Sequence, residues 1–430
     1  MAREGRASKT WALSPARASR KVVFAAVAVA FAALAGIHGC GPGAPPATSI
    51  WVAKDSDFTP EAGSSNAFDS YVLIAKNVET NVPTPLLRRV YFDPDHEKTV
   101  LGLLDQPLAQ LVEATKKKCD FHYVPPPMFA APPYQQGWRL LGRGLQWRIQ
   151  KACAAGDYDT AIADDVAATK FGFDLTGGSA LDASLGLNIA DDARKAIAPF
   201  LAKMGAQQLE VLAAGLTDAL DGKPPLTTTI DHEHERMLQG IQYIQDAYFQ
   251  NRFDDLMKNM REDVRDGVTY LRDLKSRDAS ARPAYFAGFV AEADEEARWL
   301  TSIASMPEVA RRNDPPPPLA KQRPWKSFAM ELFTAAAPLL EIDDATIART
   351  RLSILTCEIL KSIKTSQIAP KDLSGFPKEI TTDPYTGRSF AYRAASSIFD
   401  VYSLGADGID NAGDTDETCS TPDLRLEDRT

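Results

Sequence analysis

The stretch "KAIAPFLAKMGAQQLEVLAAGLTDAL", residues 195–220, carries apolar side chains three or four positions apart in two successive stripes. The first stripe consists of Ile197, Phe200, Leu201 and Met204, and the second of Leu209, Leu212, Leu216 and Leu220. An α-helix that buries one face shows this spacing, because residues three and four apart lie on the same side of it. The stretch therefore predicts two amphipathic helices packed on one another.

The same periodicity continues on both sides of this stretch, from about residue 138 to 310. A third stripe contains Met237, Leu238, Ile241, Ile244 and Tyr248, and is continued by Phe253, Leu256, Met257 and Met260. A proline-rich segment at 311–325 interrupts the pattern, and a long helix is expected at about 343–365. We predict a mainly α protein with a helical body at 66–325.

The C-terminal part, residues 326–430, is expected to differ from the body. The turn sequence "DPYTG" (383–387) has an aspartate that can cap, a proline that fixes φ and a glycine that accepts positive φ. The segments "RSFAYR" (388–393) and "SIFDVYSL" (397–404) are rich in residues that favour strands. Together with the preceding helix they predict a small α+β module, a helix plus a β-hairpin.

The N-terminus has the layout of an export signal. A basic stretch ending in Arg20 and Lys21 precedes sixteen apolar or small residues at 22–37. The exit "AGIHGC" resembles a bacterial lipoprotein box with Cys40 as the lipid acceptor, although His38 departs from that pattern. Either residues 1–40 end at a lipidated Cys40 or they remain as an uncleaved anchor. Both alternatives predict an exported protein anchored to the membrane, in the periplasm or at the cell surface.

Residues 41–65 are rich in Gly, Pro, Ala and Ser and predict a flexible tether between membrane and body.

The net charge of the chain is −9, although residues 1–40 hold six basic residues and only one acid. The remainder is therefore more acidic than the whole chain. Nucleic acid is not expected as a partner, because phosphate binding requires a basic surface.

The cysteine count fits an oxidising compartment. If Cys40 carries lipid, an even number remains: Cys119, Cys153, Cys357 and Cys419. Two disulfides are then possible in three connectivities, and nearest pairing joins Cys119 to Cys153 and Cys357 to Cys419. Four unpaired core thiols are the alternative. No pair of cysteines has the CxxC spacing, so neither a zinc site nor a thioredoxin-like motif is expected.

An acidic loop follows the second predicted strand in "FDVYSLGADGIDNAGDTDE", residues 399–417. Calcium takes six to eight oxygen ligands from carboxylates and carbonyls in a flexible loop. Four aspartates separated by small residues could supply carboxylates, namely Asp407, Asp410, Asp414 and Asp416. Glycines between them let the backbone turn and direct carbonyls inward. The loop predicts a structural calcium site, with a solvated acidic tail as the alternative.

The order of helix, turn, two strands and acidic loop resembles the C-terminal region of the major pseudopilins of type II secretion. The matching pieces are "DPYTGRSFAY" and "FDVYSLGADG", within residues 345–417. The resemblance implies that the carbonyl of Leu404 and the carboxylate of Asp407 bind Ca²⁺. The processed N-terminal helix of pseudopilins is absent, so pilus-like polymerisation is not implied. Similar endings occur on larger helical bodies in uncharacterised bacterial envelope proteins.

No motif for a catalytic nucleophile, zinc protease or phosphate-binding loop occurs in the chain. In "DHEHER" (231–236), His232 and His234 are expected in the first turn of a helix that begins at the capping box of Thr228 and Asp231. We predict a non-enzymatic envelope lipoprotein that binds or scaffolds another envelope protein. The alternatives are a hydrolase with a cleft at 66–135 that uses His96 or His122, and an accessory part of a secretion or pilus-like machine.

Overall fold

The computed structural model describes most of the helical body and of the C-terminal module. The described residues are 60, 63–87, 94–122, 134–250, 252, 282–311, 336–413 and 423–426. They all belong to one compact unit, Pro45–Thr430. The predicted signal with Cys40, most of the predicted tether, and Asp414, Asp416 and Cys419 lie outside the described residues, as does the predicted boundary at 325/326.

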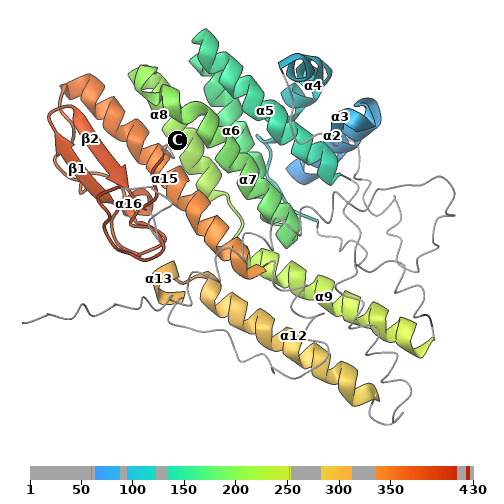
Figure 1. The fold of residues 1–430 in the computed structure, drawn as a ribbon. Helices are drawn as coiled ribbons and strands as arrows, with labels where there is room; N and C mark the ends of the chain where they lie inside the picture. The colour runs from blue at the N-terminus through green and yellow to red at the C-terminus, as the bar shows by residue number, and fades with distance from the viewer. Residues whose placement is uncertain are drawn as a thin grey trace, which may run out of the picture. The chain divides into compact units, whose positions relative to one another are not determined.

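The described residues form helices and one β-hairpin (Figure 1). In chain order the elements are α2 (Ala67–Asn81), α3 (Thr84–Leu87), α4 (Pro94–Ala114), α5 (Gln135–Ala155), α6 (Tyr158–Leu175), α7 (Ala180–Ile197), the 3-10 helix η2 (Ala198–Lys203), α8 (Ala206–Asp221), α9 (Leu226–Phe249), α12 (Arg282–Ala304), α13 (Glu308–Arg311), α15 (Ala336–Ser366), α16 (Lys378–Thr381), β1 (Ala391–Ala395) and β2 (Ile398–Tyr402). The predicted fold class, mainly α with a small C-terminal hairpin, is confirmed. No helix among the described residues is long and apolar enough to cross a bilayer.

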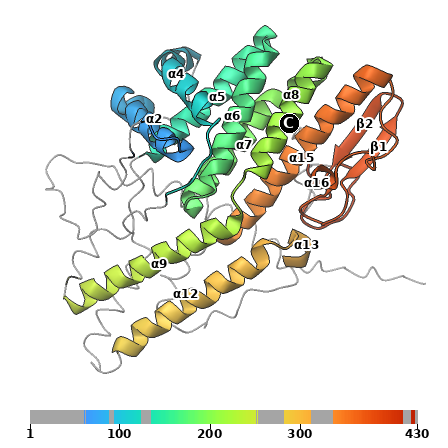
Figure 2. The same ribbon diagram turned by 180° about the vertical axis from the view of Figure 1, so that it is seen from behind.

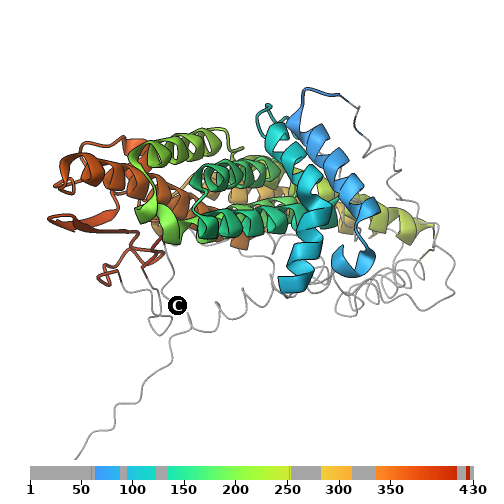
Figure 3. The ribbon, with the colours of Figure 1, turned by 90° about the horizontal axis from the view of Figure 1, so that it is seen from above.

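Helices α5, α6, α7, α8 and α15 lie side by side and form the main bundle (Figures 1 and 2). Helices α2 and α4 pack on α5 at one side of the bundle, and the hairpin lies against α15 at the other (Figure 3). Helices α9 and α12 pair with each other and share a second core with the start of α7. The hairpin therefore depends on α15 for its position, and α15 depends on the bundle.

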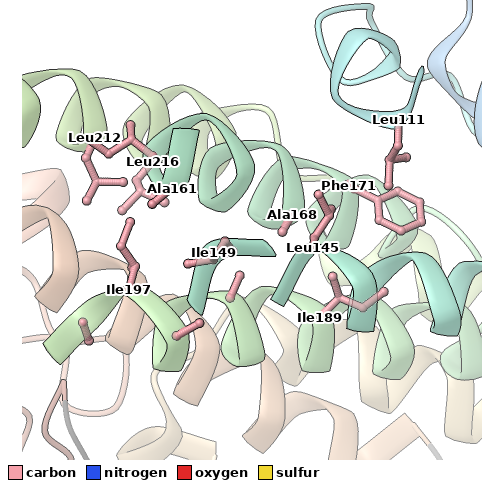
Figure 4. Packing of buried hydrophobic residues seen from close by; sticks show 14 of the residues in the cluster. Leu111, Leu145, Ile149, Ala161, Ala168, Phe171, Ile189, Ile197, Leu212 and Leu216 are labelled. Atoms are coloured by element: carbon pink, nitrogen blue, oxygen red, sulfur yellow. The ribbon is translucent and has the colours of Figure 1, made fainter. Parts of the chain in front are cut away.

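The stretch 195–220 folds as the end of α7, η2 and α8. Most side chains of both predicted stripes are buried, and Phe200 and Leu220 are partly buried. Figure 4 shows Ile197, Leu212 and Leu216 directed at a common core. The first stripe is not one continuous α-helix, because residues 198–203 tighten into a 3-10 helix that has Pro199 in its first turn.

Helix α9 carries the third predicted stripe, and Met237 and Ile241 are buried in the second core. The helix begins at Leu226, five residues before Asp231, so the capping box predicted from Thr228 and Asp231 is wrong. Pro224 and Pro225 precede the helix and fix its start earlier in the chain. The predicted continuation from Phe253 to Met260 lies outside the described residues.

The C-terminal module shares the core of the bundle. Strands β1 and β2 pair antiparallel through a two-residue turn, Ser396 and Ser397. On α15, Leu352, Leu355 and Ile359 are buried and Ile363 is partly buried. Tyr385, Phe390 and Val401 of the module join the same hydrophobic cluster. The module is therefore continuous with the helical body.

Helices α6 and α7 approach each other at two glycines. A Cβ atom added to Gly186 would lie 2.1 Å from the carbonyl oxygen of Gly172, and one added to Gly172 would lie 2.3 Å from the carbonyl oxygen of Gly186. Backbone atoms cannot give way locally, so any larger side chain must push the two helices apart.

We expect Gly186→Ala to reduce the free energy of unfolding by about 2 kcal/mol or more, because overpacking separates α6 from α7. The matched control is Gly102→Ala on α4, where an added Cβ meets nothing within 4 Å. That variant should leave stability unchanged or raise it slightly, since alanine favours helices. Urea unfolding followed by circular dichroism measures both. Equal stability of the two variants would contradict the close approach.

Candidate functional site

The DPYTG turn is organised by the carboxylate of Asp383, which is fully buried. Its Oδ1 accepts a hydrogen bond from the backbone N–H of Tyr385 at 3.0 Å. Its Oδ2 accepts from the hydroxyl of Ser403 at 2.9 Å and from the N–H of Leu404 at 3.3 Å. Burial raises the pKa of Asp383, and these donors oppose that shift. The capping role predicted for Asp383 is confirmed, and it also fixes the end of β2.

Residues 423–426 pack against the end of β2. Ser403 and Leu424 exchange two backbone hydrogen bonds, of 2.9 and 3.0 Å. The side chain of Asp423 is 2% exposed, and its Oδ2 accepts from the N–H groups of Asn411 and Gly413 at 3.0 and 2.7 Å. The acidic loop therefore folds around Asp423. Sequence analysis missed this residue, because it lies beyond the acidic run and has no regular spacing from it.

Two arginines neutralise part of the acidic loop. The guanidinium of Arg425 donates to both oxygens of Asp400, at 2.5 and 2.7 Å, and to the carbonyl of Gly413. Arg393 of β1 donates to Asp410 at 2.9 Å. Both guanidinium groups lie over the ring of Tyr402, at 5.3 and 5.6 Å from its centroid. The two arginines thus supply part of the positive charge that a bound cation would otherwise have to supply to the acidic loop.

The structure gives the predicted calcium ligands Asp410 and Asp407 different surroundings. Both oxygens of Asp410 are engaged, Oδ1 by the Tyr402 hydroxyl and the Ala412 N–H and Oδ2 by Arg393. The bond from Tyr402 is the main cause that lowers the pKa of Asp410. Asp407 accepts from the N–H of Ile409 at 3.0 Å. Asp410 could therefore bind a metal ion directly only by giving up one of these partners.

One carboxylate oxygen of Asp423 takes no part in the hydrogen bonds of the acidic loop. Its Oδ1 is buried and has no hydrogen-bond partner. Burial, followed by the nearby carboxylates of Asp410 and Asp407, raises the pKa of Asp423. A buried carboxylate oxygen without a partner is costly, and a bound cation would remove that cost. Within the described ranges no three His, Cys, Asp or Glu side chains already form a metal site, so backbone carbonyls would have to complete the shell.

The helical body uses most of its buried charges between helices. The Oδ2 atom of Asp174 accepts from the Tyr71 hydroxyl at 2.7 Å, and its Oδ1 binds Lys170. Asp164 pairs with Arg148 of α5. These pairs join α2, α5 and α6, so helix packing explains them.

The two histidines of the hydrolase alternative lie near the start of α4 and in the segment that follows it. His122 is exposed, and its ring packs edge-on against Phe68 at 6.2 Å. His96 lies half-buried near the start of α4. No acid–histidine pair that involves His122 occurs among the described residues of 66–135. In "DHEHER" the Nε2 atom of His234 lies 2.8 Å from the carboxylate of Asp294, and this contact links α9 to α12.

Three of the predicted disulfide cysteines lie in the described part, and each is a free thiol. The structure therefore does not form the Cys119–Cys153 pair that nearest pairing predicts. The reason is position, since Cys119 lies near Asp174 whereas Cys153 lies near Asp165. Burial raises the pKa of all three thiols, that of Cys153 to about 11. The partner predicted for Cys357, Cys419, lies outside the described residues.

Asp165 differs from the other buried acids of the bundle. Its side chain is fully buried on α6, and its Oδ1 has no hydrogen-bond partner. Burial raises the pKa of Asp165 to about 7, and the charge of Arg194 only partly opposes the shift. The thiols of Cys153 and Cys357 also lie near this carboxyl group. Asp165 is therefore a buried carboxyl group of α6 whose pKa is raised to near neutrality.

Comparison of the chain with protein families, curated proteins and solved structures gives no match.

We expect stability to fall as pH rises from about 4 to about 7, because the unfolded Asp165 loses its proton near pH 4 and the folded one only near pH 7. The raised pKa corresponds to a penalty of roughly 4 kcal/mol above pH 7. Asp165→Asn should remove it, so the variant should gain stability over the native chain as pH rises. Urea unfolding at pH 5 and pH 8 measures this. Asp105→Asn, at an exposed position of α4, is the control and should show no such gain.

We expect Arg425→Ala to loosen the C-terminal module, because it removes the bidentate pair with Asp400 and the contact with Tyr402. The loss should be about 1–3 kcal/mol, and the amides of β2 should exchange faster with deuterium. Arg393→Ala is the control, since its ion pair is about half exposed on both sides and should contribute little. Equal exchange rates in the two variants would show that Arg425 does not hold the module.

Proposed function

We propose that this chain is a non-enzymatic, membrane-anchored envelope protein that binds or scaffolds another envelope component through a cation-stabilised C-terminal module. The buried, unpartnered Oδ1 of Asp423 carries the cation part of the proposal. The shared core of module and bundle supports a scaffold role, because it makes the whole body a rigid support. Nucleic acid is not proposed as a partner.

Calcium is the ion that suits the residues present. The carboxylates of Asp423 and Asp407 would bind it, and the resemblance to pseudopilins adds the carbonyl of Leu404. Calcium accepts such a mixed shell of oxygen ligands, and its geometry tolerates a glycine-rich loop. Asp410 would act indirectly, because Arg393 and Tyr402 already hold its carboxylate. Asp414 and Asp416, outside the described residues, stay candidates for the remaining positions.

The ion would act as a structural clamp. Asp423 belongs to the segment that pairs with β2, and the next residues fasten that segment to the bundle. In particular, the buried guanidinium of Arg194 on α7 donates to the carbonyl of Leu426. A cation on Asp423 and Asp407 would thus connect the acidic loop, β2 and α7. The role needs no tight binding, since weak calcium sites of about 10⁻⁴–10⁻³ M are typical of modules outside the cytosol.

The proposed location at the membrane rests on the sequence. The basic stretch, the apolar run at 22–37 and Cys40 support either a lipid anchor or an uncleaved N-terminal anchor. The alternative of an accessory component in a secretion or pilus-like machine rests on the pseudopilin resemblance alone. The alternative of an envelope hydrolase gains no support from His122, whose ring packs on Phe68.

We expect calcium to raise the melting temperature of the chain, because a ligand that binds only the folded state stabilises it. At 2 mM Ca²⁺ and a Kd near 10⁻⁴ M the gain is about 2 kcal/mol. Thermal melts with Ca²⁺, with Mg²⁺ and with chelator measure it. Both Asp423→Asn and Asp407→Asn should abolish the shift.

Asp372→Asn is the matched control for this experiment, because Asp372 is exposed and its carboxylate accepts from Ser374 in a separate loop. It should keep the full calcium shift. Asp407→Asn provides a second test of the site if Asp423→Asn unfolds the loop. Identical melting of the native chain in calcium and in chelator would contradict the proposed site.

A further inference from the structure

A buried carboxyl group inside the bundle has an oxygen without a hydrogen-bond partner. Asp165 of α6 is 1% exposed, and its Oδ1 atom accepts no hydrogen bond. It lies on the same side of α6 as Ala161 and Ala168, which Figure 4 shows in the hydrophobic core. An ionised carboxylate in such surroundings is costly unless a cation reaches it. Once Asp165 loses its proton, it therefore attracts a guanidinium group within reach.

The register of α6 against α7 brings Arg194 to this carboxyl group. The two helices are joined by a short turn, run antiparallel and meet closely at Gly172 and Gly186. About two turns along each helix from that contact lie Asp165 on α6 and Arg194 on α7. The positive charge of Arg194 is also the main influence that opposes the rise of the Asp165 pKa on burial. Arg194 is itself only 6% exposed, so the two groups lie near each other inside the bundle.

In the structure, Arg194 fastens the C-terminal segment to α7. Its Nη1 atom donates a hydrogen bond to the backbone carbonyl of Leu426. Leu426 belongs to residues 423–426, which also bind the hairpin, because Ser403 and Leu424 exchange two backbone hydrogen bonds. The bond from Arg194 is thus a direct link between this segment and the helical bundle.

Arg194 can leave Leu426 without stranding another buried charge. Its Nε atom donates to the carboxylate of Asp191 at 2.9 Å, but Asp191 has two further cationic partners. The Nζ atom of Lys195 lies 2.8 Å from one oxygen of Asp191, and the Nη1 atom of Arg349 lies 3.3 Å from the other. The charge of Asp191 therefore stays balanced when the Arg194 guanidinium changes position.

We propose that Asp165 and Arg194 form a pH-sensitive latch, in which ionised Asp165 draws the guanidinium away from the carbonyl of Leu426 and so loosens the C-terminal segment. The neutral acid leaves Arg194 on Leu426, which is the arrangement in the structure. A carboxylate competes better than a carbonyl for a guanidinium, because a bond between two ions is stronger where water is excluded. Only the proton of the carboxyl group is exchanged, and it passes between Asp165 and solvent. The latch goes beyond the proposed calcium site, since it acts on the segment that carries Asp423 whether or not an ion is bound.

The groups around Asp165 identify it as the one that responds near neutral pH. Cys153 of α5 and Cys357 of α15 lie near it, and burial raises the pKa of both thiols, that of Cys153 to about 11. Asp164, which precedes it on α6, is paired with Arg148 of α5. The buried residues of α8 are leucines and alanines. Further charged groups lie beside these neighbours, namely Lys203, Glu358, Lys361 and Asp105. The charge that changes near neutrality is therefore that of Asp165, whose pKa burial raises to about 7.

The test measures hydrogen–deuterium exchange of the full chain at pH 6 and pH 8, in chelator, so that the result does not depend on the proposed calcium site. The peptides that contain Ser403 and Leu424 report docking of the C-terminal segment, because their amides bond to each other's carbonyls. We expect their protection, corrected for the intrinsic effect of pH, to be about ten-fold or more lower at pH 8, as loss of a charged hydrogen-bond donor allows. A peptide from α4 reports global unfolding and should lose less protection.

Asp165→Asn keeps the shape of the neutral acid, so this variant should hold the segment equally well at both pH values. Arg194→Met removes the donor, so the segment should be loose at pH 6 as well as at pH 8. Asp105→Asn, at an exposed position of α4, is the matched control and should keep the native pH response. The native response in Asp165→Asn, or equal loss of protection in the segment and in α4, would overturn the latch.

Discussion

The close approach of α6 and α7 at Gly172 and Gly186 is the constraint on which the other helices depend. With no side chain between the two backbones, α5 and α8 pack against α6, and α15 packs against α7. Helix α15 then presents the surface on which the hairpin rests. A shift of α7 would also move Arg194, which holds the carbonyl of Leu426. The geometry of the acidic loop is therefore set partly by a glycine contact far from it in the sequence.

Buried charge in this protein is mostly balanced inside the fold. Asp174 and Asp164 have cationic partners on neighbouring helical turns or helices, so the cost of their burial is offset locally. Asp165 and Asp423 are the exceptions, since each has a buried oxygen without a partner. The two differ in surroundings. Burial of Asp165 favours the neutral acid, and the nearby Arg194 only partly opposes this. The carboxylates of Asp410 and Asp407 lie near Asp423, and the proposed cation would offset their repulsion.

The helical body could be predicted from the sequence because its signal is local. Spacing of three and four identified α8, α9 and α15 correctly, and the strand formers located the hairpin. The starts of helices and the breaks within them were harder to predict from the sequence. The 3-10 segment after Ile197 and the early start of α9 depend on proline positions that a hydrophobic pattern does not register. Element type follows from periodicity, but the exact ends depend on single residues.

Only part of the candidate site could be predicted from the sequence, and the reason is a different one. Asp407 and Asp410 stand out in an acidic run, yet the run does not show that Arg393 holds Asp410 across the hairpin. Asp423 was missed because its relation to Asn411 and Gly413 is made by tertiary folding. The long-range pairs of an aspartate with an arginine on another strand cannot be read from spacing. Cys119 and Cys153 fail as a pair for the same reason, since nearness in sequence says little about nearness in a bundle.

Charge balance around the acidic loop would make the proposed calcium site weak rather than tight. Asp400 of β2 and Asp410 of the loop are matched by Arg425 and Arg393. Calcium affinity rises with the number of charged ligands. A proposed shell with only two carboxylates, those of Asp407 and Asp423, would therefore suit the millimolar concentrations found outside cells better than cytosolic ones. Arg425 would also keep the loop folded when the ion dissociates, so the proposed cation would reinforce the module and would not be a condition for its folding.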